Sequence, residues 1–241
     1  MGYEFDWSVL LTYKELLISG FIMTLKLSII GIFFAFIVGS IMGLARVSKN
    51  FFIALFSTYY VEFFRNIPLI VQMFFIYFSF NLTEVFPFLE VISKWIGVEY
   101  SNEFFSALIA LITYTSTYIA EAIRGGIQSL PKGQFEAAKT LGMSYFQSMF
   151  YIIFPQAIKI VWGPITSQFI NLIKNSSLAM TIGVAELTFQ TQEIDSITFR
   201  GFEAATAVTV LYLLLTLSTS GIMLVVNKYF LIRTSSVRNS L

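Results

Sequence analysis

The chain has 241 residues, of which 56% are hydrophobic and 17% aromatic, while only 12% are charged. A soluble domain carries about a quarter charged residues, so this composition excludes a disordered chain and argues against a water-soluble globule. The formal net charge of +1 provides no positive field for nucleic acid. The absence of cysteine and histidine excludes disulfides, thiolate metal sites and Ser-His-Asp triads. These properties predict an all-α integral membrane protein.

The first 19 residues do not have the pattern of a signal peptide. Acidic Glu4, Asp6 and Glu15 take the place of a basic n-region, and no small-residue cleavage site follows. The sequence alternates instead between apolar and charged side chains over residues 3–17. We therefore expect residues 1–19 to form an interfacial helix at the membrane surface.

Five stretches are long and apolar enough to cross a bilayer, which requires about 20 residues of helix. They cover residues 20–45, 51–80, 104–123, 160–181 and 203–227. The second stretch is longer than a bilayer requires, and Pro68 within it lacks a backbone donor, so we expect a break near this residue. Residues 81–103 are rich in charge, and residues 182–202 combine an apolar part with a polar one.

The distribution of basic residues predicts the orientation of these spans. If spans one, three and five end on one side, nine basic residues lie there and three lie on the other side. The nine are Arg46, Lys49, Arg124, Lys132, Lys139, Lys159, Lys228, Arg233 and Arg238, and the three are Lys14, Lys94 and Arg200. Because basic residues concentrate in cytoplasmic loops, we expect the N-terminus outside and the C-terminus in the cytoplasm. The segment 125–159 then forms a cytoplasmic loop.

This loop has the signals of two short helices. For the first helix, Ser129 is a candidate cap, Pro131 suits a first turn, and Gly142 is a favourable left-handed stop. A second, aromatic helical stretch covers residues 144–154 and is expected to end at Pro155. These signals alone are equally compatible with an ordinary helix–turn–helix connection between two spans.

The order of residues in the loop resembles a known motif. Glu136, Ala137 and Ala138 are followed by Gly142, nine further residues and then Ile152-Ile153-Phe154-Pro155. This pattern is similar to the EAA loop of permease subunits of bacterial ABC importers, with Phe154 in place of leucine as its one departure. Further stretches resemble the polar amino acid branch of these permeases, namely residues 20–27, 62–69, 120–127, 133–134 and 174–178.

The resemblance covers nearly the whole chain and implies a single transmembrane domain over residues 1–241, in the bacterial cytoplasmic (inner) membrane. It implies a transport subunit rather than an enzyme, paired with an identical or homologous permease. The sequence has no G-x-x-x-x-G-K-[ST] phosphate loop, so ATP and Mg are expected on a separate ABC ATPase dimer and no cofactor on this chain. In the family the ATPase binds the EAA loop, which implies coupling roles for Gly133, Glu136, Ala137, Ala138 and Gly142.

The family also implies a mechanism and further partners. A periplasmic or lipid-anchored solute-binding protein delivers a polar amino acid, and closure of the ATPase dimer shifts the permease between inward and outward states. The remaining partner is membrane lipid, and no nucleic acid is expected.

Polar residues within the spans are candidates for the substrate path, because ionisable groups inside a membrane are costly. Arg65 could bind a substrate carboxylate or could simply be neutralised by Glu62 three residues earlier. Lys26 lies near the outer end of its span, where its side chain can snorkel. Glu121 and Arg124 flank the inner end of span three and are equally plausible as structural anchors.

Span four carries a polar stripe. At 3.6 residues per turn, Ser167, Asn171 and Lys174 share one face, with Ser177 near its edge. Such a stripe should face protein or water, so it either lines the substrate path or forms hydrogen bonds across a dimer interface. Gln72 of span two is a further candidate for the path, and Glu186 is a candidate for an outer gate.

Another class of transporter remains as an alternative. A secondary transporter driven by an ion gradient would have paired hydropathy repeats and broken helices in corresponding halves, whereas five spans without visible duplication fit that architecture poorly. An intramembrane enzyme has little chemistry available, because histidine, cysteine and paired carboxylates across spans are missing.

Overall fold

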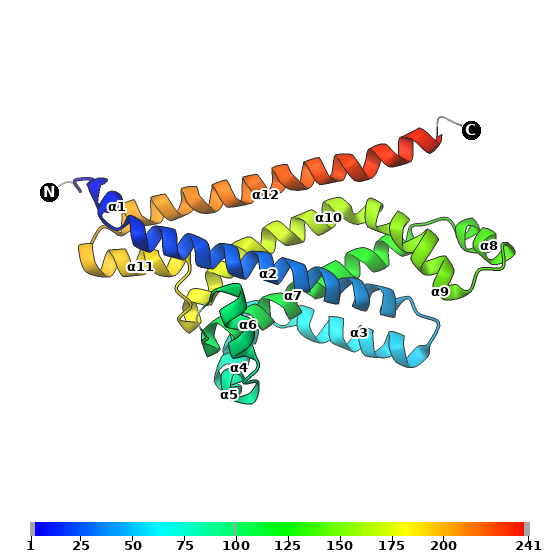
Figure 1. Cartoon of the computed structure of the whole chain (residues 1–241), viewed down its shortest axis with the longest axis horizontal. Coiled ribbons are helices and arrows are strands. Elements are labelled where there is room, and N and C mark those ends of the chain that lie inside the picture. Colours follow the sequence, from blue (N-terminus) through cyan, green and yellow to red (C-terminus); the bar gives the residue numbers. More distant parts are fainter. Residues whose placement is uncertain (1–2, 99, 239–241) are drawn as a thin grey trace. The chain divides into compact units, whose positions relative to one another are not determined.

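The computed structural model describes residues 3–98 and 100–238, with side chains described as far as residue 228 (Figure 1). Every regular element in this part of the chain is helical. The α-helices are α1 (Ser8–Thr12), α2 (Lys14–Arg46), α3 (Phe51–Asn66), α4 (Leu69–Ser79), α5 (Leu82–Val85), α6 (Leu89–Ile96), α7 (Asn102–Gln128), α8 (Lys132–Thr140), α9 (Tyr145–Ser148), α10 (Phe154–Asn175), α11 (Leu187–Thr198) and α12 (Gly201–Arg238). A π-helix, η1 (Met149–Ile153), precedes α10, and a 3-10 helix, η2 (Ser176–Ile182), follows it.

Within residues 3–98 and 100–238, four helical segments are long and apolar enough to cross a membrane, namely Lys14–Arg46, Asn102–Gln128, Tyr145–Ile182 and Gly201–Lys228. The pair α3 and α4 provides a fifth span if it is counted as one, and it is bent by 102° at the break around Pro68. The prediction of about five transmembrane helices is therefore confirmed, as is the break. Proline ends α3 because its ring restricts the preceding residue and its nitrogen has no hydrogen to donate.

The chain divides into two compact packing units. Unit 1 contains residues 1–34, 67–114 and 170–218, and unit 2 contains residues 35–66, 115–169 and 219–241. The assignment of the whole chain to one domain stays a prediction.

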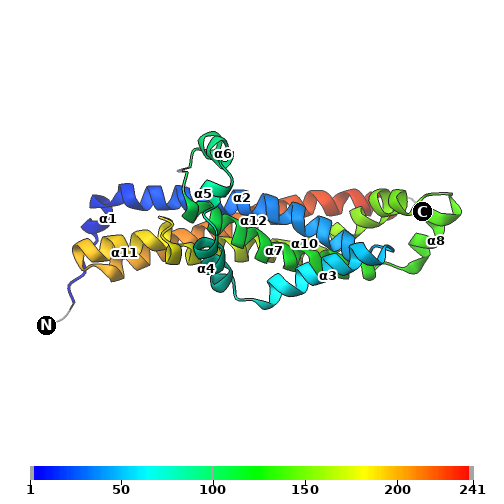
Figure 2. The same cartoon turned by 90° about the horizontal axis from the view of Figure 1, so that it is seen from below.

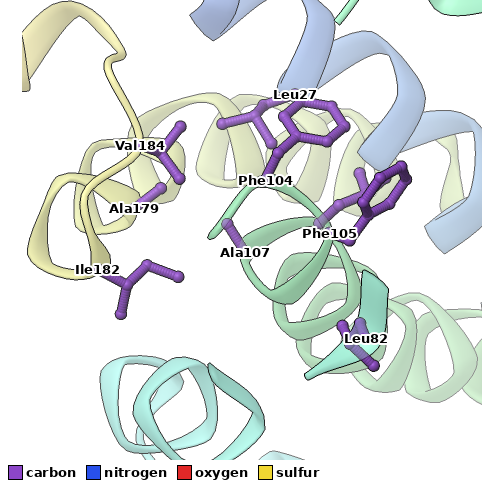
Figure 3. Close-up of a cluster of buried hydrophobic side chains, with 9 residues drawn as sticks. Leu27, Leu82, Phe104, Phe105, Ala107, Ala179, Ile182 and Val184 are labelled. Carbon is purple, nitrogen blue, oxygen red and sulfur yellow. The ribbon is translucent and has the colours of Figure 1, made fainter. Parts of the chain in front are cut away.

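Unit 1 has a buried core between α2, α5, α7 and η2. Figure 3 shows Leu27, Leu82, Phe104, Phe105 and Ala107 together with residues of η2 and the segment after it. Phe104 is 2% exposed, so its ring is stabilised by close van der Waals packing against the neighbouring helices. Figure 2 shows α5 and α6 beside the N-terminal half of α2.

The N-terminal segment of unit 1 is attached to the start of α12. The buried carboxylate of Glu203 accepts hydrogen bonds from the Tyr3 hydroxyl and, at 2.8 Å, from the Asp6 backbone N–H. Arg200 lies 3.7 Å from the same carboxylate and donates to the carbonyl of Glu4. The predicted single helix over residues 1–19 is not found, because only Ser8–Thr12 form a separate helix and Lys14 already begins α2. The position of this segment at the membrane interface stays a prediction. Residues 1–2 of that range lie outside the described part.

Unit 2 depends on a close approach of α2 to α7. A Cβ added at Gly39 would lie 2.7 Å from Ile119, and one added at Gly43 would lie 2.9 Å from the backbone oxygen of Ala120. Two glycines four residues apart present a flat helix surface, which allows helices to pack backbone against backbone in membranes.

Two details of the loop over residues 125–159 differ from the prediction. Ser129 does not cap α8, since α7 continues to Gln128 and the Ser129 hydroxyl donates to the carbonyl of Gly126 at 2.8 Å. Pro155 does not end a helix either, because α10 begins at Phe154 and continues through it. The π-helix just before it supplies a wider turn, which accommodates the missing donor of proline.

Candidate functional site

The predicted coupling residues lie on α8 and in the turn that follows it. Glu136 and Ala137 are exposed, whereas Ala138 on the next position is 1% exposed and holds the helix against the rest of unit 2. Gly142 has a φ of +75°, a left-handed conformation that favours glycine. The predicted helix stop at Gly142 is therefore confirmed, and it turns the chain sharply towards α9.

The second part of the loop begins with a strong cap. The Ser144 hydroxyl accepts from the Gln147 backbone N–H at 3.2 Å, and the Gln147 side chain accepts from the Ser144 N–H at 2.9 Å. This reciprocal capping box satisfies two backbone donors at the start of α9. Tyr145 then donates to the carbonyl of Val47 at 2.9 Å, which ties the loop to the end of α2.

A cavity of about 590 Å³ lies beside α8 within unit 2. It is lined by Val47, Lys49, Ile127, Lys132, Phe135, Glu136, Lys139, Met143, Tyr145, Ser148 and Met149. On the outer surface of the same loop, Leu141, Phe146 and Tyr151 are 69–77% exposed. The loop thus presents large apolar side chains next to Glu136, which is a composition suited to contact with another protein.

An ion-pair network joins α2, α3 and α7 in unit 2, with Glu121 at its centre. The Glu121 carboxylate accepts from Arg46 and, at 2.8 and 3.0 Å, from Arg124, and it lies 3.8 Å from Arg65. Arg46 also donates to Glu62 at 2.8 Å. This network is consistent with the predicted alternative in which Glu121 and Arg124 are structural anchors.

The structure separates Arg65 from the partner suggested by sequence. Glu62 pairs with Arg46 rather than with Arg65, so simple neutralisation at i and i+3 is not the arrangement found. The Arg65 side chain is 43% exposed, and its guanidinium lies 5.7 Å from the ring centre of Tyr118. Part of its donor fork thus remains open to solvent.

A second cavity, of about 380 Å³, lies in unit 1 between η2, α11 and α12, at the end of α10. It is lined by Lys174, Ser177, Thr188, Thr191, Ala205, Val208, Thr209 and Tyr212. The cavity combines one ammonium group and five hydroxyl groups with a mainly apolar surface. The lysine can bind a carboxylate, whereas each hydroxyl group already donates its hydrogen within the chain and offers its oxygen as an acceptor.

Glu186 supports one wall of this cavity. Its side chain is fully buried, and its carboxylate accepts from the backbone N–H groups of Thr188 and Phe189, both at 2.9 Å, as the cap of α11. The Tyr212 hydroxyl donates to the same carboxylate at 2.5 Å. Glu186 therefore fixes Tyr212, which lines the cavity, and its role in an outer gate stays a prediction.

The structure brings only some predicted path residues together. Lys174 and Ser177 line the same cavity, whereas Asn171 and Gln72 of unit 1 are not among its lining residues. Gln72 is 4% exposed and donates to the carbonyl of Ile67 at 2.9 Å, just before the Pro68 break. Ser167 belongs to unit 2, where its hydroxyl donates to its own helix.

The contribution of α11 and α12 to this cavity was not predicted from the sequence. Thr188, Thr191, Thr209 and Tyr212 are uncharged and scattered over 25 positions, and they converge only through tertiary packing. The pairing of Tyr212 with Glu186 has no local sequence signal. The role of Arg46 in the ion-pair network around Glu121 was also not predicted. The sequence shows only that Arg46 and Arg124 follow spans one and three, which are predicted to end on the same side of the membrane.

Comparison with known proteins decides the family. Residues 31–230 match the family described as "Binding-protein-dependent transport system inner membrane component". This chain belongs to that family. It is therefore an inner-membrane component of a transport system rather than an enzyme, as predicted.

Individual relatives agree with the family match. The chain is 35% identical to the glutamate/aspartate import permease protein GltJ of Escherichia coli, over 89% of this chain and 90% of that protein. It is 38% identical to the probable glutamine ABC transporter permease protein GlnM of Bacillus subtilis, over 88% and 92% of the two chains. A crystal structure of an amino acid ABC transporter with histidines superposes with a TM-score of 0.77 at 33% identity, covering 94% of this chain and all of that one.

Proposed function

We propose that this chain is the membrane-spanning permease subunit of an ATP-driven importer of a polar amino acid. The observation that carries the proposal is the similarity to GltJ and GlnM over almost nine tenths of the chain. A separate ATPase supplies the energy, and the permease alternates between inward and outward states. A second permease subunit and a solute-binding protein complete the importer.

The loop geometry supports coupling through α8. Ala138 is buried and fixes the helix, while Glu136 and Ala137 remain accessible to an ATPase surface. Gly142 and the capping box at Ser144 hold the following turn in one conformation. A movement imposed on α8 is therefore transmitted to α9 and on through the continuous helical segment into α10, rather than being lost in a flexible loop.

The cavity at Lys174 supports an amino acid substrate. Every α-amino acid carries a carboxylate, which the Lys174 ammonium in the wall of this cavity would attract. Arg65, Gln72, Ser167 and Asn171 remain candidates for other parts of the path. The outer gate is proposed to involve Glu186, through its effect on Tyr212.

The test is reconstitution of the chain in proteoliposomes with a partner ABC ATPase and a solute-binding protein. Uptake of radiolabelled glutamate, glutamine, arginine and histidine is measured with ATP inside the vesicles. We expect uptake of one polar amino acid that depends on ATP and on the binding protein. Uptake driven by an ion gradient without ATP would contradict the proposal and favour a secondary transporter.

Two variants test the coupling role of the loop separately. Glu136→Arg and Gly142→Pro should abolish ATP-driven uptake while the chain still inserts and assembles, because they alter the contact helix and its stop. Gly125→Ala is the matched control, since a Cβ at this position has nothing within 4 Å. Full ATP-driven uptake by both loop variants would refute coupling through α8.

A further inference from the structure

The short helix α6 has three distinct faces. Leu89, Ser93 and Ile96 are buried or half-buried and form the face that points into unit 1. Glu90 and Lys94 form a second face and pair at 2.7 Å. The third face carries Phe88, Val91, Ile92 and Trp95, whose exposed fractions are 59%, 71%, 40% and 88%. At 100° per residue these four side chains cover one continuous arc of the helix.

This exposed apolar face is presented by a well-fixed helix. Lys26 of α2 donates to the carbonyl of Gly97, at the C-terminal end of α6, where a cation is favourable. Tyr100 donates to the carbonyl of Thr83, and Asn102 accepts from the Leu82 N–H at 2.8 Å. The segment from α5 to α6 is thus attached to the spans on both sides.

The surroundings of this face identify its partner. The preceding span helix α4 exposes Phe75 and Phe78 by 64% and 77%, and Phe80, directly after it, by 47%. Val85 and Phe86 continue the exposed apolar surface from there to α6. In a chain of this inner-membrane family, a flank of a span helix that no partner subunit covers contacts lipid, and tryptophan is enriched where a span meets the headgroup region, which is the position proposed for Trp95.

The charges of α6 agree with a lipid partner. Glu90 and Lys94 neutralise each other next to the apolar arc, on a face that can remain in water. A helix with one apolar arc, one charged face and terminal aromatic residues has the pattern of an interfacial helix. Because α6 has no excess of positive charge, its contact with lipid should not require anionic headgroups.

We propose that the α5–α6 segment is a membrane-interface anchor, in which the face of Phe88, Val91, Ile92 and Trp95 lies in the boundary between lipid headgroups and acyl chains. The anchor fixes the connection between the bent second span and α7 at one depth in the bilayer. This role is independent of which solute the permease transports.

Three consecutive residues allow a direct test. The chain has no native cysteine, so Lys94→Cys, Trp95→Cys and Ile96→Cys each provide one labelling site, on the charged, apolar and core faces respectively. Each variant of the full chain carries a nitroxide spin label and is reconstituted with its ATPase in phosphatidylcholine vesicles. Electron paramagnetic resonance then measures collisions of the label with oxygen, which dissolves in lipid, and with a water-soluble nickel chelate.

The expected result is a ratio of oxygen to nickel collisions that is higher at position 95 than at position 94. The label at position 96 should collide little with either reagent, because Ile96 packs against the core. A label at 95 that collides mainly with nickel would overturn the proposal by placing this face in water. Low collision with both reagents at 95 would overturn it as well, because another protein surface would then cover the face. If Trp95→Cys does not fold, Val91→Cys reports on the same arc one turn earlier.

Discussion

Glu121 offers the sharpest test of how the ion-pair network of unit 2 stabilises the chain. Its carboxylate is 18% exposed and contacts Arg46, which is 13% exposed, and Arg124, which is 34% exposed. The Glu121→Gln variant keeps the shape but removes the charge that these guanidinium groups share. Removing one partner of a buried ion pair costs about 3–5 kcal/mol, whereas an exposed pair contributes about 0–1 kcal/mol.

The expected loss lies between these limits. Arg46 retains Glu62 at 2.8 Å, and the network is partly exposed, so Glu121→Gln should lower the free energy of unfolding by about 2–3 kcal/mol. Glu62→Gln is the matched control from the same network. Its side chain is 50% exposed, so its loss should stay below about 1 kcal/mol. To measure both losses in the free energy of unfolding, each purified variant in mild detergent is unfolded by adding dodecyl sulfate. Far-UV circular dichroism monitors the unfolding. Equal losses for the two variants would refute the central position of Glu121.

The remaining predictions concern single positions. Gly43→Ala should destabilise the chain by about 1–3 kcal/mol, because the new Cβ would lie 2.9 Å from a backbone oxygen of α7. Gly125→Ala, on the open side of α7, should be neutral or stabilising by up to about 1 kcal/mol. The same unfolding titration distinguishes the two variants. Gly142→Ala should cost about 1–2 kcal/mol, since its φ of +75° is unfavourable for a side chain, and an unchanged unfolding midpoint would contradict this. Tyr212→Phe should cost about 1.5–3 kcal/mol by removing a hydrogen bond to the buried Glu186 carboxylate, and stability equal to that of the native chain would argue against this contact.

Local chemistry predicted those parts of the fold that depend on a few neighbouring residues. The break at Pro68 follows from a missing donor, and the left-handed stop at Gly142 follows from the absence of a side chain. Span positions follow from long apolar runs, whose burial in lipid does not depend on the details of packing. These features are therefore visible in one sequence.

The errors arose where a distant contact or an irregular helix decided the outcome. Ser129 has the residue type of a cap, but α7 extends far enough to use its hydroxyl in a helical turn. Pro155 has the residue type of a helix end, but a π-helix before it admits the ring. Only Lys174 and Ser177 of this cavity were predicted from the sequence. Thr188 and Tyr212 are uncharged and reach the cavity only through tertiary packing.

The attachment of the N-terminal segment to Glu203 has a practical consequence for purification. A tag that replaced residues 3–6 would remove the Tyr3 hydroxyl and the Asp6 backbone N–H that satisfy this carboxylate. The hydrogen bonds that attach the N-terminal segment to the start of α12 would then be lost, and the yield of folded material should fall. Affinity handles for this chain therefore belong at its other end.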